Sequence, residues 1–303
     1  MKNTLLSWAR ERGYLVAWGP ASLPELAGQN LRRRERDGEI DRAFARGNLT
    51  FATAGDVPDD WRVLVVAAPR PAHLLRFIVE GTPIEALMPP TYERYRPIFE
   101  DVRQDLGEHP LAGYRLTTVS APLKTLASML GLARYGRNNI AYVPEMGSYV
   151  QLFGYATDAP LPVEPDWTPR APSLLDECVG CGVCTALCPT GAIDPNRVLL
   201  RAERCLTLAN ESTGPWPPHV PPDAHHCLIG CLLCQQHCPA NPALPVADSG
   251  VAFTEAETQA LIAEGDRSGP CWDAVRARLD TLGSPSLDEV LGRNLRALLG
   301  ALR

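Results

Sequence analysis

The chain has 303 residues, of which 45% are hydrophobic and 21% are charged, and its formal net charge is −6. This composition supports a folded core and excludes wholesale disorder, and the length predicts two domains or one large and one small domain. The acidic balance disfavours a general nucleic-acid binder, and no apolar run reaches the roughly 18 residues of a membrane span. Because the N-terminal segment carries charges where a signal peptide is apolar, we expect a cytoplasmic protein.

The first elements alternate between helical and strand patterns. Thr4–Arg12 predicts a short amphipathic helix, and the charged stretch Leu31–Arg46 predicts a solvated helix face, although its arginine run could also contact phosphate. Trp61–Ala68 is a bounded, valine-rich run that predicts a buried strand. No Gly-x-Gly-x-x-Gly or P-loop pattern is present, so the sequence does not support a standard dinucleotide or nucleoside triphosphate site.

Three further elements follow before residue 165. Tyr92–Leu106 predicts a helix in which Pro97 marks a start or a kink. Leu123–Leu130 predicts a helix that ends near Gly131, and Ser148–Thr157 predicts a strand. These patterns favour an α/β arrangement for the first part of the chain.

The remaining chain begins with a proline-rich connection and ends in a helical tail. Thr254–Glu257 and Ser286–Glu289 both have the capping-box pattern that starts a helix. We therefore expect an α+β protein with an α/β domain over 1–165, a cysteine-rich domain over 166–245 and C-terminal helices over 246–303.

All of the chain's cysteines lie in its second half. Clustered thiols in a chain with no export signal indicate metal binding rather than a disulfide framework. The ten residues are Cys178, Cys181, Cys184, Cys188, Cys205, Cys227, Cys231, Cys234, Cys238 and Cys271.

The first cysteine motif matches the bacterial ferredoxin run C-x2-C-x2-C-x3-C-P. It comprises Cys178, Cys181, Cys184 and Cys188, followed by a proline. Three of these thiolates would bind one 4Fe-4S cluster and Cys188 would bind a second. Zinc is the alternative, because paired Cys-x2-Cys elements also form tetrahedral zinc sites.

The second motif is less regular and lacks one ligand. Cys231, Cys234 and Cys238 repeat the closing part of the first motif, and by the crossover rule Cys238 completes the first cluster. The second cluster then needs a fourth ligand beside Cys188, Cys231 and Cys234. Spacing slightly favours Cys227 and leaves Cys205 open. Cys271 is expected to be a buried apolar residue. Two clusters in one small module predict one-electron transfer.

A longer segment before the cysteines carries a family resemblance. Ser120–Leu161, the isolated Arg-Cys-Leu around Cys205, and the final Gly-Arg-Asn-Leu-Arg of the tail are similar to the epoxyqueuosine reductases. These are cobalamin-dependent iron–sulfur enzymes of tRNA queuosine synthesis, and the reductive dehalogenases are a more distant likeness. The resemblance covers about residues 110–300 well and the first hundred residues loosely.

The resemblance implies a nitroreductase-like α/β domain that binds cobalamin, and a ferredoxin-like domain with two 4Fe-4S clusters. It favours Cys205 over Cys227 as the fourth ligand of the second cluster. It also implies an external electron donor such as flavodoxin or ferredoxin, and a tRNA partner that the net charge does not support. The matching positions, which would contact cobalamin, are Ser120, Ala121, Pro122, Gly136, Asn138, Gly147, Ser148, Thr157 and Asp158. Without the family, the glycines would be interpreted as turn residues.

One departure from the family concerns the proton donor. The family's aspartate in an Asp-Tyr-His context aligns best with Thr91-Tyr92-Glu93, so the aspartate is missing. Tyr92, Glu93 or Tyr95 would then donate the proton, and queuosine chemistry comes into question. The alternative is a non-catalytic electron-transfer or corrinoid-handling protein that kept the clusters and lost the acid.

Overall fold

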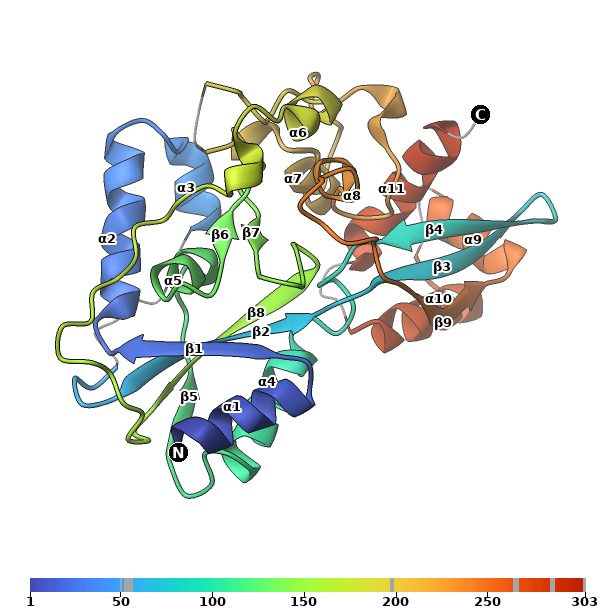
Figure 1. The fold of residues 1–303 in the computed structure, drawn as a ribbon. Helices are drawn as coiled ribbons and strands as arrows, with labels where there is room; N and C mark the ends of the chain where they lie inside the picture. The colour runs from blue at the N-terminus through green and yellow to red at the C-terminus, as the bar shows by residue number, and fades with distance from the viewer. Residues whose placement is uncertain (50, 52–56, 197–198, 264–266, 284–286, 302–303) are drawn as a thin grey trace.

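The computed structural model describes residues 1–49, 51, 57–196, 199–263, 267–283 and 287–301. A four-stranded antiparallel sheet in the order β1-β2-β8-β5 forms the centre of the N-terminal half (Figure 1). Its strands are β1 (Leu15–Pro20), β2 (Arg62–Pro69), β5 (Leu116–Thr118) and β8 (Val150–Thr157). The strands predicted at Trp61–Ala68 and Ser148–Thr157 are therefore confirmed.

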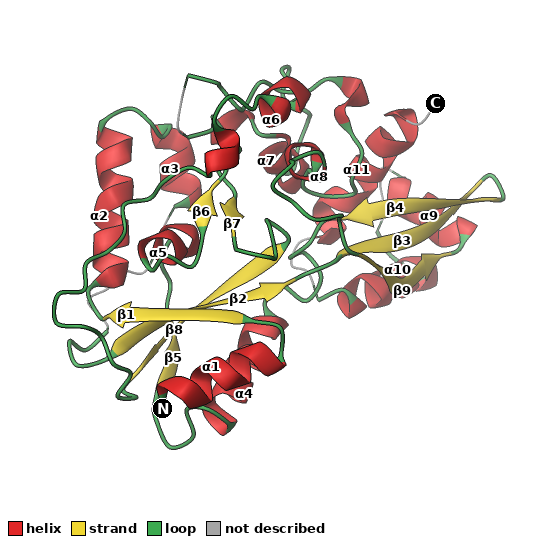
Figure 2. Ribbon diagram, in the orientation of Figure 1, coloured by secondary structure: helices red, strands yellow, loops and turns green. Residues whose placement is uncertain are grey.

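Helices cover both faces of this sheet (Figure 2). Successive side chains of β2 point to opposite faces, so Val63 and Val65 pack in one core while Leu64 and Val66 pack in the other. One core is completed by α2 (Leu23–Arg36) and α5 (Leu123–Met129), and the other by α1 (Lys2–Glu11) and α4 (Pro97–Glu108). A short helix, α3 (Arg42–Asn48), follows α2.

The predicted helix boundaries agree with the local chemistry. Helix α4 begins at Pro97, which fits the first turn because its missing N–H has no partner there. Helix α5 ends just before Gly131, whose φ of +73° is the left-handed conformation that favours glycine. The charged stretch Leu31–Arg46 forms the end of α2 and most of α3, as a solvated face requires.

The cysteine-containing segment consists of loops and short helices. These are α6 (Val183–Leu187), α7 (Leu206–Glu211) and α8 (Leu233–Gln236). A two-stranded ribbon of β6 (Arg134–Tyr135) and β7 (Ala141–Tyr142) lies between α5 and these helices (Figure 1). The ribbon therefore joins the α/β part to the cysteine-rich part.

The C-terminal segment contains a strand as well as helices. Strand β9 (Val246–Phe253) pairs in parallel with β3 (Ala72–Val79), and β4 (Thr82–Met88) completes the sheet β4-β3-β9. Its helices are α9 (Glu255–Ile262), α10 (Pro270–Thr281) and α11 (Leu287–Ala301). The expectation of helices alone over 246–303 was incomplete, because Asp248-Ser249-Gly250 masks the strand pattern and the partner strand is about 170 residues away.

Two local expectations for this segment have different outcomes. Thr254 and Glu257 form the predicted capping box, whereas Ser286 lies outside the described residues. The prediction that Cys271 is buried was wrong: it is exposed at the start of α10. Neighbouring helix residues point about 100° apart, and Trp272 takes the buried direction. In the part of the chain that the structure describes, no helix is long and apolar enough to cross a membrane.

Candidate functional site: a cysteine centre beside a cavity

Tight loops present the first group of thiols. Cys178 ends a single 3-10 turn, Gly180 follows with a φ of +72°, and α6 begins after Gly182. The backbone N–H of Arg137, at the tip of the β6-β7 ribbon, donates to Cys178 Sγ at 3.4 Å. Backbone donors of this kind stabilise negative charge on thiolate sulfur.

The first three cysteines of the first motif lie close to Cys238 of the second motif. Burial, and then the charges of Cys178, Cys238 and Cys181, raise the pKa of Cys184. The structure therefore brings together the four residues that the crossover rule assigns to one cluster.

A second group of thiols, which includes Cys231 and Cys234, is more strongly affected by burial. Burial raises the pKa of Cys231 to about 12, and the charges of Cys205 and Cys188 add to this effect. Burial and the charges of Cys231 and Cys205 likewise raise the pKa of Cys234. Metal binding would reverse this cost, because bound cysteines are thiolates.

Cys227 has different surroundings from Cys205. Its side chain is 1% exposed and packs with Tyr149 and Leu232. Burial raises its pKa, and Cys231 is the only cysteine that adds to the effect. Cys205 interacts with both Cys188 and Cys231. This arrangement favours Cys205 as the fourth ligand, which stays a prediction.

The thiols do not form a site for a single ion. Among the described residues, no group of three or more His, Cys, Asp or Glu side chains could hold one metal ion. A tetrahedral zinc site would draw four sulfurs to about 2.3 Å from one point. Two sets of four thiols are instead the donor chemistry of two 4Fe-4S clusters.

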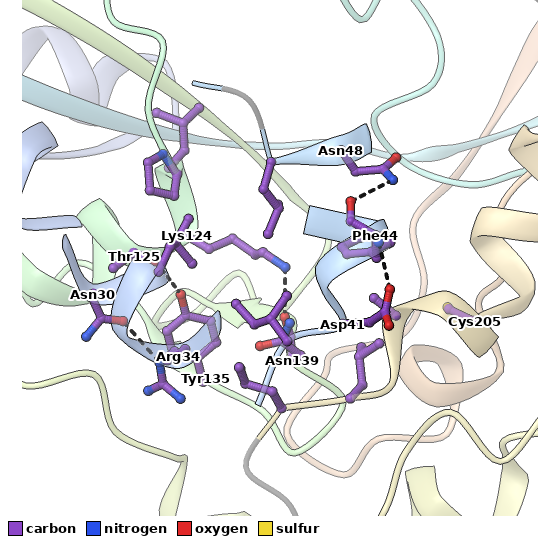
Figure 3. Close-up of a pocket in the computed structure, with 18 of the residues that line it drawn as sticks. Asn30, Arg34, Asp41, Phe44, Asn48, Lys124, Thr125, Tyr135, Asn139 and Cys205 are labelled. Carbon is purple, nitrogen blue, oxygen red and sulfur yellow. Dashed lines mark hydrogen bonds between the residues drawn. The ribbon is translucent and has the colours of Figure 1, made fainter. Parts of the chain in front are cut away.

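A cavity of about 510 Å³ lies against the second group (Figure 3). Cys205 is the N-cap of α7, and Cys205, Leu208 and Glu211 follow at intervals of three and all line the cavity. The opposite walls come from α2, α3 and the start of α5. A 4Fe-4S ligand candidate and the cavity therefore share a wall.

The cavity contains a lysine that sequence analysis did not single out. Lys124 extends toward Asn139, and its Nζ donates to the Asn139 carbonyl oxygen at 3.0 Å (Figure 3). The side chain is accessible from within the cavity yet surrounded by protein, and this burial lowers its pKa. Asn139 has a φ of +61°, which holds its carbonyl in this direction.

Tyr92 is connected to the cavity by Glu211, a second residue that the sequence analysis missed. Its hydroxyl donates to Glu211, and its ring packs so closely on Gly230 that a Cβ there would lie 2.6 Å from the hydroxyl oxygen. Burial raises the pKa of Glu211. In the sequence, the signal that could have indicated Glu211 was its helical spacing from Cys205.

The other two candidate proton donors, Glu93 and Tyr95, lie in different environments. Glu93 forms an ion pair with Arg70 at 2.8 Å and is largely enclosed. Tyr95 lines the cavity and is 43% exposed. The structure therefore places Tyr95 and the partner of Tyr92 at the cavity, whereas Glu93 is held by an arginine.

The predicted cobalamin residues do not converge on one cavity. Ala121 and Pro122 line the 510 Å³ cavity. Gly136 and Asn138 lie instead beside the first cysteine group, where Asn138 Nδ2 donates to the Cys234 carbonyl oxygen at 3.0 Å. A Cβ at Gly136 would lie 2.4 Å from both Asn138 and Tyr142, so protein atoms fill its open side.

The remaining positions contact other parts of the protein. The Ser148 N–H donates to Asn241 Oδ1 at 2.7 Å, and Gly147 packs on the same asparagine. Thr157 is buried at the end of β8. Asp158 accepts from both the N–H and the guanidinium of Arg115. Ser120 is exposed.

Two histidines lie next to Cys227 in the sequence. His226 stabilises a loop, since its Nε2 accepts from the Leu232 N–H at 3.0 Å. His225 is buried, with its ring centroid 4.3 Å from that of Trp216. Neither histidine lines the cavity.

Comparison with known proteins agrees with this arrangement. Residues 177–241 match the family model of the 4Fe-4S double cluster binding domain. An epoxyqueuosine reductase of Burkholderia pseudomallei is 34% identical over 295 residues, covering 83% of this chain and 70% of that protein. One from Pseudomonas aeruginosa is 28% identical over 263 residues, covering 80% and 69%.

Solved structures show the same fold. Epoxyqueuosine reductase from Streptococcus thermophilus matches with a TM-score of 0.68 and 16% identity, over 100% of this chain and 81% of that one. An epoxyqueuosine reductase with an epoxyqueuosine-modified tRNA-Tyr stem loop matches with a TM-score of 0.67 and 18% identity, over 99% and 81%. The expected α+β class is confirmed, and so is the two-cluster 4Fe-4S domain. The chain belongs to the epoxyqueuosine reductase family of reductase enzymes.

Proposed function

We propose that this protein is a cobalamin-dependent reductase in which two 4Fe-4S clusters deliver electrons to the 510 Å³ cavity. One observation carries the proposal: Cys205 interacts with the second cysteine group and also lines the cavity. A thiolate ligand in the wall places the end of an electron path next to the space in which a ligand would bind.

The proposed ligand sets follow the two electrostatic groups. The first is Cys178, Cys181, Cys184 and Cys238, and the second is Cys188, Cys205, Cys231 and Cys234. Clusters held in this way transfer one electron at a time. The crossover of Cys188 and Cys238 between the two motifs keeps the groups adjacent.

The cavity could hold part of a large cofactor. Its volume lies in the range of ligand pockets, and apolar side chains form most of its walls. Ala121, Pro122, Tyr135 and Asn139 would contact the cofactor. No histidine is among the described residues that line the cavity. Bound cobalamin would supply a metal centre that accepts electrons and reduces a substrate.

The Tyr92–Glu211 pair is the proposed proton source. Burial raises the pKa of Glu211, so its carboxyl group keeps a proton more readily than an exposed one. The Tyr92 hydroxyl holds the carboxyl group in position at the cavity wall. A glutamate on α7 would thus replace the missing aspartate near Thr91.

The first cysteine group is the proposed entry point for electrons. Val179 is 84% exposed beside Cys178, and Val183 and Leu187 are also exposed. An apolar surface of this kind suits a small redox protein such as flavodoxin or ferredoxin. The substrate is proposed to be epoxyqueuosine in tRNA, as in the neighbour bound to a tRNA stem loop.

The decisive experiment uses the anaerobically purified full chain. We expect about eight irons per chain, and a base-off spectrum on addition of cobalamin. A chemical reductant should then support reduction of an epoxyqueuosine-modified stem loop. Stoichiometric zinc without iron would overturn the electron path, and a spectrum unchanged at micromolar cobalamin would overturn the cofactor assignment.

A non-catalytic electron-transfer or corrinoid-handling protein is the second candidate. The observation that favours it is the ion pair between Glu93 and Arg70, which removes one candidate acid from the cavity. On this alternative the protein would bind cobalamin and accept electrons, but it would fail to restore queuosine in a strain that lacks the reductase.

A further inference from the structure

The chain contains very little lysine. It has two lysines, Lys2 and Lys124, against 27 arginines. Lys2 begins α1 on the surface, whereas Lys124 projects into the cavity. The cavity therefore holds a compact ammonium group, which binds an anion as a point charge rather than through the planar fork of arginine.

Among the described residues, Lys124 forms no ion pair with a carboxylate. Its Nζ donates a hydrogen bond to a neutral group, the Asn139 carbonyl oxygen, at 3.0 Å. No described carboxylate forms an ion pair with its Nζ. The charge of Cys205 favours the ammonium form, but burial outweighs it and the pKa is lowered. An ammonium group that faces an accessible cavity and has no carboxylate partner can bind an anion there.

Some other charged groups of the cavity already have partners. Arg34 pairs with Glu39 at 2.6 Å. Asp41 accepts from the Phe44 N–H at 2.7 Å and so caps α3.

Two acidic groups in or near α7, Glu203 and Glu211, also line the cavity. Glu211 accepts from Tyr92, whereas Glu203 has no hydrogen bond to a described residue. Neither carboxylate pairs with Lys124. Among the described residues that line the cavity, Lys124 is thus the cation without a carboxylate partner.

We propose that Lys124 forms an anion-binding site inside the cavity and holds a phosphate group of the ligand that occupies it. Two sources share this chemistry: the phosphodiester of a cobalamin nucleotide and a phosphate of the substrate. Only the choice between them rests on the proposed function. A phosphate oxygen would accept a charge-assisted hydrogen bond from Nζ, which is stronger than the present bond to a carbonyl.

The scarcity of lysine makes the site directly observable. Reductive methylation with ¹³C-formaldehyde labels Lys124, Lys2 and the N-terminal amine, which gives three NMR signals. Inorganic phosphate should shift the Lys124 signal in a saturable manner and leave the Lys2 signal unchanged. Equal shifts of the Lys124 and Lys2 signals, or none, would overturn the proposal.

Substitution then identifies the source of the phosphate. Lys124→Met should weaken phosphate binding by about tenfold or more, and Lys124→Arg should retain part of it. Cobalamin carries the phosphodiester and cobinamide lacks it. If Lys124→Met weakens binding of cobalamin but not cobinamide, the cofactor supplies the anion. If it weakens phosphate binding and leaves both corrinoids unaffected, the substrate does.

The outcomes separate this proposal from the proposed function. A phosphate-dependent Lys124 signal without cobalamin binding would retain the anion site and overturn the cofactor. Normal cobalamin binding without an effect of phosphate on the Lys124 signal would retain the cofactor and overturn the anion site. If Lys124→Met changed only the reduction potential of the second cluster, Lys124 would be a counter-charge for Cys205 and the anion site would be wrong. Iron content and circular dichroism verify that each variant folds.

Discussion

At the scale of single residues, surroundings rather than identity separate the two candidate ligands. Cys205 and Cys227 are both thiols upstream of Cys231, and spacing slightly favours Cys227. In the folded chain Cys205 lines the cavity and interacts with three other cysteines, whereas Cys227 is packed among apolar side chains. A thiol enclosed by apolar atoms keeps its proton and behaves as a small hydrophobic residue.

We predict that Cys205→Ser loses one cluster while Cys227→Ser keeps both. The first variant should contain about four irons per chain and the second about eight, because serine replaces a ligand only at residue 205. Iron analysis of anaerobic protein, with electron paramagnetic resonance of the reduced state, gives the answer. The opposite pattern would make Cys227 the ligand.

A second residue-scale prediction concerns the proposed acid. Glu211→Gln keeps the shape and the hydrogen bond from Tyr92 but removes the ionisable proton, so turnover should fall by about 100-fold or more. Cobalamin binding and iron content should stay unchanged. Glu203→Gln, at the same cavity, is the matched control. An unchanged rate in Glu211→Gln would exclude this glutamate as the donor.

At the scale of elements, local and distant interactions have separate roles. Helix α9 starts where its own residues dictate, because Thr254 and Glu257 exchange hydrogen bonds within one turn. Strand β9 immediately before it depends on β3, since Phe253 stacks on Phe77 at 4.9 Å across the parallel pair. The first element is visible in sequence, and the second requires its partner.

Removing the N-cap of α9 tests how much its local hydrogen bonds contribute to stability. Thr254→Ala should lower the free energy of unfolding by about 1 kcal/mol, because the N–H of Glu257 loses its acceptor. Gln259→Ala, on an exposed position of the same helix, should stay within about 0.5 kcal/mol of the native value. Chemical denaturation measures both. Equal effects would show that the cap does not stabilise α9.

At the scale of the whole molecule, the C-terminal helix α11 forms hydrogen bonds to the segments that carry the second cysteine group. Asn294 of α11 is fully buried, and its Nδ2 donates to the carbonyl oxygens of Asn210 and Leu228. Asn210 lies in α7, and Leu228 lies in the loop before Cys231. The C-terminal segment therefore supports the site as well as packing on β3 and β4.

Asn294→Leu should loosen this support. The substitution leaves two buried carbonyl groups without their donor, which costs about 1–3 kcal/mol of stability. We expect the second cluster to be lost to a chelator faster than the first. Arg276→Gln, exposed on α10, should match the native protein. Loss of both clusters at the same rate would show that α11 supports the domain as a whole.

The sequence alone predicted the features whose cause is local. The ferredoxin spacing, the start of α4 at Pro97, the end of α5 at Gly131 and the strand at Trp61–Ala68 all follow from neighbouring residues. The resemblance carried by Ser120–Leu161 and the cysteines added the family, which the relatives confirm.

The tertiary structure decided everything that depends on distant segments meeting. It paired β9 with β3, turned Cys271 outward, and separated the predicted cobalamin residues, of which Ala121 and Pro122 line the cavity. It also brought Lys124, Cys205 and Glu211 to one cavity from two helices. Spacing along a chain determines what one turn can do, whereas burial, charge pairing and cavity walls arise from contacts that only folding creates.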